Sequence, residues 1–72
     1  MRTSRQFYRV DRRQISMVRF VLEAYEGIGV ATTLDAVSGL IVIAVAPGCE
    51  NMVEHIMADL GRQFMVEACE SA

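Results

Sequence analysis

The longest apolar run in this 72-residue sequence is the seven residues 40–46, which Pro47 closes. Side chains of a strand alternate between two faces, and in this run both faces are apolar. Such a run is typical of a central strand that is covered on both sides. A helix needs about 18 apolar residues to span a bilayer, so the run is too short for that role. The sequence therefore predicts a sheet built around residues 40–46.

Two further segments, residues 5–10 and 28–34, favour strands because they are rich in β-branched and aromatic residues. Five residues, 35–39, separate the second segment from residues 40–46, which predicts a hairpin. Residues 62–67 fit either a short edge strand or an extension of the preceding helix. The sequence alone leaves these two alternatives open.

Two amphipathic helices are predicted between the strands. The first covers residues 12–26, where Asp11 and Gln14 have the spacing of a capping box and Gly27 is expected to end the helix. The second begins at Pro47-Gly48 and runs to Leu60, with apolar residues repeating at helical spacing. One apolar stripe on each helix is expected to pack on the sheet.

The predicted order of elements is β-α-β-β-α, with a short last strand if residues 62–67 form one. A strand-helix-strand unit whose parallel strands flank a third strand is a split β-α-β arrangement. We therefore expect residues 1–72 to form a single α+β domain, a ferredoxin-like two-layer sandwich. Helices in so short a chain cover one face of the sheet, so the other face is expected to be open.

The apolar content predicts self-association. The chain is 53% hydrophobic, and a domain this small has a core too limited to bury such an excess. We expect a homo-oligomer, with a dimer as the first expectation. The candidate interface residues, on one side of the first helix and on the sheet, are Met17, Phe20, Ala24, Ile41, Ile43 and Val45. If the helix surface is the contact, Phe20→Glu is expected to dissociate the oligomer.

Charge is unevenly distributed along the chain. Residues 1–19 carry six Arg and one Asp (net +5), whereas residues 20–72 carry one Arg and eight acids (net −7). Arginines beside the free N–H groups of a helix start are suited to binding an anion. The candidate anion-binding residues are Arg12, Arg13, Arg9 and Arg5. Nucleic-acid binding is less favoured, because the middle strand offers aliphatic rather than aromatic side chains and the net charge is −2.

The residue types and their spacing do not indicate catalysis or a metal site. Cys49 and the single histidine, His55, fall on different faces of the predicted second helix. We expect no metal, no cofactor and no enzymatic activity. The enzyme alternative requires a site that is completed across a subunit interface and contains Cys49 or His55 beside an acid. With two cysteines, no signal peptide and no membrane span, the protein is expected to be cytoplasmic.

Five short segments carry a resemblance to a known group of sequences. They are Tyr8-Arg9-Val10-Asp11, Leu22-Glu23-Ala24-Tyr25-Glu26-Gly27, Thr32-Thr33-Leu34-Asp35, Gly39-Leu40 and Ala46-Pro47-Gly48. Together they resemble a family of short bacterial proteins of unknown function, over about residues 8–62. The resemblance implies a bacterial origin and a cytosolic setting, and it implies no particular activity.

The predicted order of elements is also similar to that of the ACT regulatory domains. That similarity implies an ACT-like module, because ACT domains bind amino acids or other small effectors between paired domains. The ligand loops of ACT domains use glycine, whereas this chain has Asp11-Arg12-Arg13-Gln14 there. The leading hypothesis is a non-catalytic, homo-oligomeric module that senses a small-molecule ligand or acts as a protein-interaction adaptor. The alternative is an anion or nucleic-acid binder that uses the N-terminal arginines.

Overall fold

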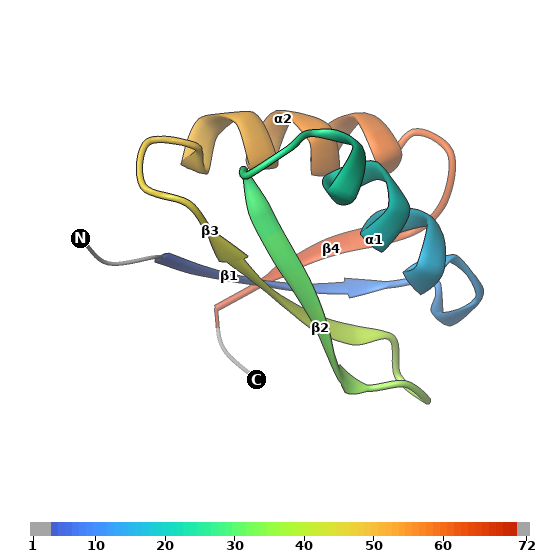
Figure 1. Ribbon diagram of the computed structural model, residues 1–72. Helices are drawn as coiled ribbons and strands as arrows, with labels where there is room; N and C mark the ends of the chain where they lie inside the picture. Colours follow the sequence, from blue (N-terminus) through green and yellow to red (C-terminus); the bar gives the residue numbers. More distant parts are fainter. Residues whose placement is uncertain (1–3, 71–72) are drawn as a thin grey trace.

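The structure, a computed structural model, describes residues 4–70 and places two helices over one face of a four-stranded antiparallel sheet (Figure 1). The predicted α+β class is thereby confirmed. The elements are β1 (Ser4–Val10), a 3₁₀ turn η1 (Arg12–Gln14), α1 (Ile15–Ala24), β2 (Gly29–Asp35), β3 (Leu40–Val45), α2 (Glu50–Leu60) and β4 (Val66–Cys69).

The strands lie in the order β2-β3-β1-β4. Strand β3 pairs antiparallel with both β1 and β2, so β1 and β2 run parallel and α1 crosses from one to the other. The short strand β4 pairs antiparallel with β1 and forms one edge of the sheet. The structure thus takes the edge-strand alternative for the C-terminal segment, four residues later than the predicted start at Arg62.

The register between β1 and β3 decides which face of the sheet is buried. Gln6 and Tyr8 lie opposite Ile43 and Ile41 and face the helices, whereas Arg5 lies opposite Ala44 and faces away from them. Arg5 and Arg9 occupy the other side of β1, where their guanidinium groups stay hydrated. The uncharged residues of β1 therefore face the helices. The buried core consists of Tyr8, Val10, Val18, Leu22, Ile28, Ala31, Ile41, Ile43, Val45, Val53, Met57 and Leu60.

This register corrects one sequence-based expectation. Ile41, Ile43 and Val45 were predicted as interface residues, but each is 0% exposed and packs in the core beneath the helices. The uncovered side of β3 carries Leu40, Val42 and Ala44, which are half-buried. We call the side of the sheet away from the helices the open face.

The start of the first helix also differs from the prediction. Asp11 accepts a hydrogen bond from the backbone N–H of Arg13 at 3.0 Å, and the backbone N–H of Gln14 bonds to the Asp11 carbonyl oxygen at 2.7 Å. These bonds close a 3₁₀ turn. They do not form a capping box, because the side chain of Gln14 makes no cap hydrogen bond. Helix α1 therefore begins at Ile15 and ends at Ala24, inside the predicted range 12–26.

The β2–β3 turn packs against the end of β1. Asp35 accepts hydrogen bonds from the backbone N–H groups of Val37 (3.0 Å) and Ser38 (3.4 Å). Gly39 follows with φ of +80°, and its carbonyl oxygen accepts the N–H of Val10 at 2.9 Å. A Cβ at this position would overlap the carbonyl oxygen of Val10. Glycine is thus required by both the backbone angle and the contact.

Candidate functional site

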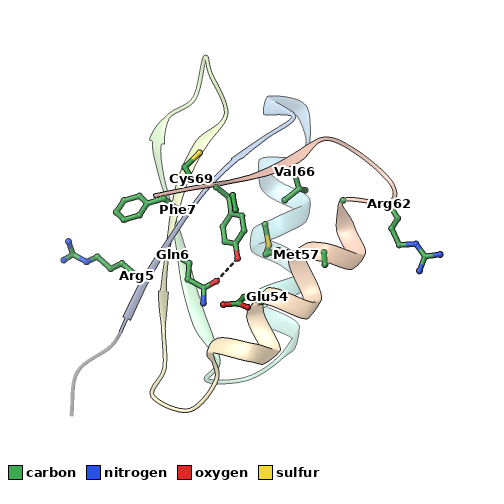
Figure 2. A pocket seen from close by; sticks show the side chains of 12 residues that line it. Arg5, Gln6, Phe7, Glu54, Met57, Arg62, Val66 and Cys69 are labelled. Carbon is green, nitrogen blue, oxygen red and sulfur yellow. Dashed lines mark hydrogen bonds between the residues drawn. The ribbon is translucent and has the colours of Figure 1, made fainter. Parts of the chain in front are cut away.

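A cleft of about 630 Å³ lies between α2 and the part of the sheet formed by β1 and β4 (Figure 2). Small residues leave this space open, since Ala58 and Gly61 stand at the end of α2 and Ala68 stands on β4. The residues that line it are Arg5, Gln6, Phe7, Tyr8, Glu54, Met57, Ala58, Gly61, Arg62, Val66, Ala68 and Cys69. Its volume falls within the range of small-molecule sites, roughly 300–1,000 Å³.

Polar groups gather at one end of the cleft. The hydroxyl of Tyr8 donates a hydrogen bond to Oε1 of Gln6 at 2.6 Å, as Figure 2 shows, and Nε2 of Gln6 donates to the carbonyl oxygen of Glu50 at 3.4 Å. Burial raises the pKa of Tyr8 above its ordinary value, and the negative charge of Glu54 raises that pKa further. The Tyr8 hydroxyl therefore stays protonated at neutral pH.

The other surfaces of the cleft have different chemistry. Met57 and Val66 provide apolar carbon and sulfur, and Arg62 places a cation at the C-terminal end of α2 (Figure 2). The guanidinium of Arg62 is mostly exposed and lies 3.9 Å from the carboxylate of Asp59. A ligand in the cleft would thus meet the carboxylate of Glu54 at one end and apolar atoms along the walls, while the guanidinium of Arg62 points away from the cleft (Figure 2).

The start of α2 is attached to β1 through Glu50. Its Oε2 accepts a hydrogen bond from the hydroxyl of Ser4 at 2.9 Å, and its Oε1 accepts the backbone N–H of Gly48 at 3.1 Å. Hydrogen bonding from its own backbone N–H and from Ser4 lowers the pKa of Glu50 below its ordinary value of 4.5. The ionised carboxylate therefore holds one wall of the cleft in place.

The lowered pKa of Glu50 predicts a loss of stability in acid. A carboxyl group with a lower pKa in the folded state stabilises the fold above its unfolded pKa, and this contribution disappears as the pH falls through the folded pKa. We expect the Tm of the wild type to fall below about pH 4.5, and Glu50→Gln to make that fall shallower. Ser4→Ala, which removes one donor, is expected to act in the same direction with a smaller effect.

The measurement is thermal unfolding by circular dichroism between neutral and strongly acidic pH. Parallel curves for the wild type and Glu50→Gln would show that Glu50 contributes nothing to the acid dependence. Asp11 and Asp35 also have lowered pKa values, because Arg13 and Ser38 donate hydrogen bonds to them, so part of the acid dependence is expected to remain in the Glu50→Gln variant.

The four predicted anion-binding arginines do not meet at one site. Arg13 donates to Asp11 through Nε (3.2 Å) and a terminal nitrogen (3.0 Å), so its guanidinium is already paired. Arg5 and Arg9 lie on β1 on the open face, where Arg9 is opposite Glu67 of β4. Arg12 is exposed in the 3₁₀ turn. The structure therefore divides the group between the sheet and the turn.

The predicted surface on the first helix is exposed. Phe20 is 67% exposed and Met17 45% exposed, and Ala24 is exposed as well, so these side chains are free of core contacts. On the open face, Val42 is half-buried and Val30 is 67% exposed. Both surfaces remain candidates for subunit contacts.

Cys49 and His55 lie apart from the cleft, whereas Cys69 is one of its lining residues. Cys49 packs against the core at the start of α2, His55 is exposed, and neither lines the cleft. Among residues 4–70, no three His, Cys, Asp or Glu side chains are grouped in a way that could hold a metal ion. No helix in this range is long and apolar enough to cross a membrane.

Sequence comparison supports a family assignment. No curated protein and no solved structure matches this chain. A family model described as "Domain of unknown function (DUF4911)" matches residues 8–64, from β1 to the turn after α2. The resemblance to a family of unknown function, predicted over residues 8–62, is confirmed. The chain belongs to the DUF4911 family, a domain of unknown function.

Proposed function

We propose that this chain is a cytoplasmic, non-catalytic, homo-oligomeric module with a ferredoxin-like (ACT-like) fold, and that it senses a small molecule bound in the cleft beside α2. The placement of β3 between the parallel strands β1 and β2 supports the fold assignment. One observation carries the ligand proposal. Tyr8, Gln6 and Glu54 converge at one end of a cleft whose other walls include the apolar Met57 and Val66.

The polar end of the cleft is organised before any ligand arrives. Tyr8 is 6% exposed, and its hydrogen bond to Gln6 fixes both side chains, so little side-chain entropy is lost when a ligand binds. The carboxylate of Glu54 favours a ligand group that donates hydrogen bonds or carries positive charge. The apolar walls add affinity through burial of the ligand's hydrocarbon part.

The same geometry favours binding over catalysis. Tyr8 has a raised pKa, so its hydroxyl is a poor base at neutral pH. Cys49 and His55 lie outside the cleft lining, so the enzyme alternative lacks its two named candidates there. Anion or nucleic-acid binding is also less favoured, because Arg13 is paired with Asp11 and the other arginines are spread over two elements.

The ligand proposal predicts that filling the cleft removes a retained small molecule. We expect native mass spectrometry of the protein purified from its own cells to show a defined extra mass on the wild type. Ala58→Phe places a ring in the cleft and is expected to abolish that mass. Ala36→Phe, the matched change at an exposed position in the β2–β3 turn, is expected to retain it.

Two results would contradict the proposal. The first is an extra mass that persists in Ala58→Phe, which would place the ligand elsewhere. The second is a wild type with no extra mass that also shows no shifts of cleft amides in NMR spectra with a library of small polar and aromatic fragments. Neither result tests the oligomeric state, which analytical ultracentrifugation over a dilution series measures separately.

A further inference from the structure

Hydrogen-bond acceptors outnumber donors at the polar end of the cleft. The hydroxyl hydrogen of Tyr8 is already donated to Oε1 of Gln6, and Nε2 of Gln6 donates one of its two hydrogens to the carbonyl oxygen of Glu50. The lone pairs that remain belong to the Tyr8 oxygen, the Gln6 amide oxygen and the Glu54 carboxylate. This end of the cleft is therefore suited to a ligand group that donates several hydrogen bonds.

The same end carries negative charge that no cation neutralises. Figure 2 shows Glu54 reaching from α2 toward Gln6 and Tyr8. The ion pairs within residues 4–70 join Arg13 to Asp11 and Arg62 to Asp59, and neither involves Glu54. Glu50 lies one helical turn before Glu54, and like charges at this spacing destabilise a helix. A bound cation would relieve that repulsion.

The two arginines that line the cleft do not face its polar end. Figure 2 shows the guanidinium groups of Arg5 and Arg62 pointing away from Gln6 and Tyr8. Arg5 follows the open face of the sheet, and Arg62 lies 3.9 Å from the carboxylate of Asp59. A ligand carboxylate at the polar end would thus meet Glu54 and no positive charge. The geometry therefore disfavours a free amino acid, which carries such a carboxylate beside its ammonium group.

We infer that the cleft binds a small organic cation, in which a primary ammonium group is attached to an apolar body without a carboxylate. The inference rests on the proposed ligand-binding function and names the class of ligand. The ammonium group offers three N–H donors, which suit the Glu54 carboxylate and the Tyr8 oxygen. Hydrogen bonds between two charged groups are about twice as strong as those between neutral groups.

The space for the apolar body extends from Glu54 along α2. Ala58 follows Glu54 by one helical turn on the same face, and Gly61 comes directly after the last residue of the helix. Met57 and Val66 form apolar walls beside this space. A thioether makes favourable contacts with aromatic rings, so Met57 suits a flat aromatic body.

Three matched indole compounds test the ligand class. Tryptamine carries the ammonium group, tryptophol has a hydroxyl in its place, and tryptophan adds a carboxylate to tryptamine. The chain contains no Trp, so indole fluorescence comes from the ligand alone and its anisotropy reports binding. Tryptamine is expected to bind with a Kd at least about fivefold lower than either analogue. Equal Kd values for tryptamine and tryptophol would overturn the ammonium preference and leave the ligand-binding function intact.

Variants of α2 test which carboxylate is responsible. Glu54→Gln keeps the size of the side chain and removes its charge, so it is expected to raise the Kd for tryptamine at least about fivefold and leave that for tryptophol unchanged. Asp59→Asn removes the same charge from an exposed position outside the cleft lining and is expected to retain the preference. A preference that survives Glu54→Gln contradicts the inference. Circular dichroism checks that both variants are folded.

Two further outcomes separate the ligand class from the proposed function. Ala58→Phe is expected to abolish the binding of tryptamine, and binding that persists in this variant places the site elsewhere and overturns both proposals. If the wild type binds none of the three compounds, the ammonium inference is wrong. The proposed function then depends on the retained mass in native mass spectrometry. A retained molecule that contains no amine overturns the inference alone.

Discussion

Gly39→Ala is expected to cost more than about 3 kcal/mol, a loss comparable to the roughly 3–5 kcal/mol that a core of this size supplies. The φ of +80° alone costs an L-residue about 1–2 kcal/mol. The added Cβ would also overlap the Val10 carbonyl oxygen, a main-chain atom that moves only if β1 moves. The variant is thus expected to be largely unfolded in urea titrations followed by circular dichroism.

Gly48→Ala is the matched control for this variant. Gly48 has a φ of +86°, close to that of Gly39, but a Cβ there meets no atom within 4 Å. Only the backbone penalty of about 1–2 kcal/mol applies, so this variant is expected to stay folded. Equal losses in the two variants would show that the Val10 contact contributes nothing beyond the backbone angle.

Ile43→Ala is expected to destabilise the fold by about 2–5 kcal/mol, because it removes a fully buried side chain from the central strand and leaves a cavity. Val42, its neighbour on the open face, is half-buried. Val42→Ala is therefore expected to cost about 1 kcal/mol or less. The contrast between adjacent residues of β3 measures directly which face the helices cover.

Urea unfolding at two protein concentrations checks the origin of that loss. A cost that belongs to the folding of one chain is the same at both concentrations, whereas a cost that belongs to a subunit interface depends on concentration. A larger loss for Val42→Ala than for Ile43→Ala would reverse the assignment of the faces. A concentration-dependent loss for Ile43→Ala would return Ile43 to the predicted interface.

The strands and helices could be predicted because their signals are local. Residues 40–46 form a continuous apolar run, and β3 occupies Leu40–Val45 within it. The helix boundaries were less accurate, since Asp11 caps a 3₁₀ turn rather than an α-helix. Residues 62–67 fitted a strand and a helix equally, and the choice depends on the pairing of β4 with β1, which is distant in sequence.

The buried face of β3 could not be predicted from its own residues. Both sides of the strand are apolar, so periodicity gives no preference between Ile43 and Val42. The register with β1 decides the matter, because the uncharged side of β1 faces the helices and the arginine side faces solvent. Interface residues assigned to β3 without that register were placed on the wrong face.

The cleft was also beyond a reading of the sequence. Its walls come from β1, α2 and β4, and the residues that create the space are ordinary small residues such as Ala58, Gly61 and Ala68. The alternation of Gln6 and Tyr8 on one side of residues 5–10 was visible in the sequence. The position of Glu54 beside them depends on how α2 lies across the sheet.

The shortness of β4 has a consequence for how the molecule opens. This strand pairs with β1 over only four residues, at the edge of the sheet and at the end of the described chain. It can detach while the central β1–β3 pair stays intact, so its amides are expected to exchange with solvent before those of β3. Since Val66 and Ala68 form one wall of the cleft, each detachment exposes the binding site. A molecule bound there would slow hydrogen exchange in β4, and that slowing would report occupancy without a label on the ligand.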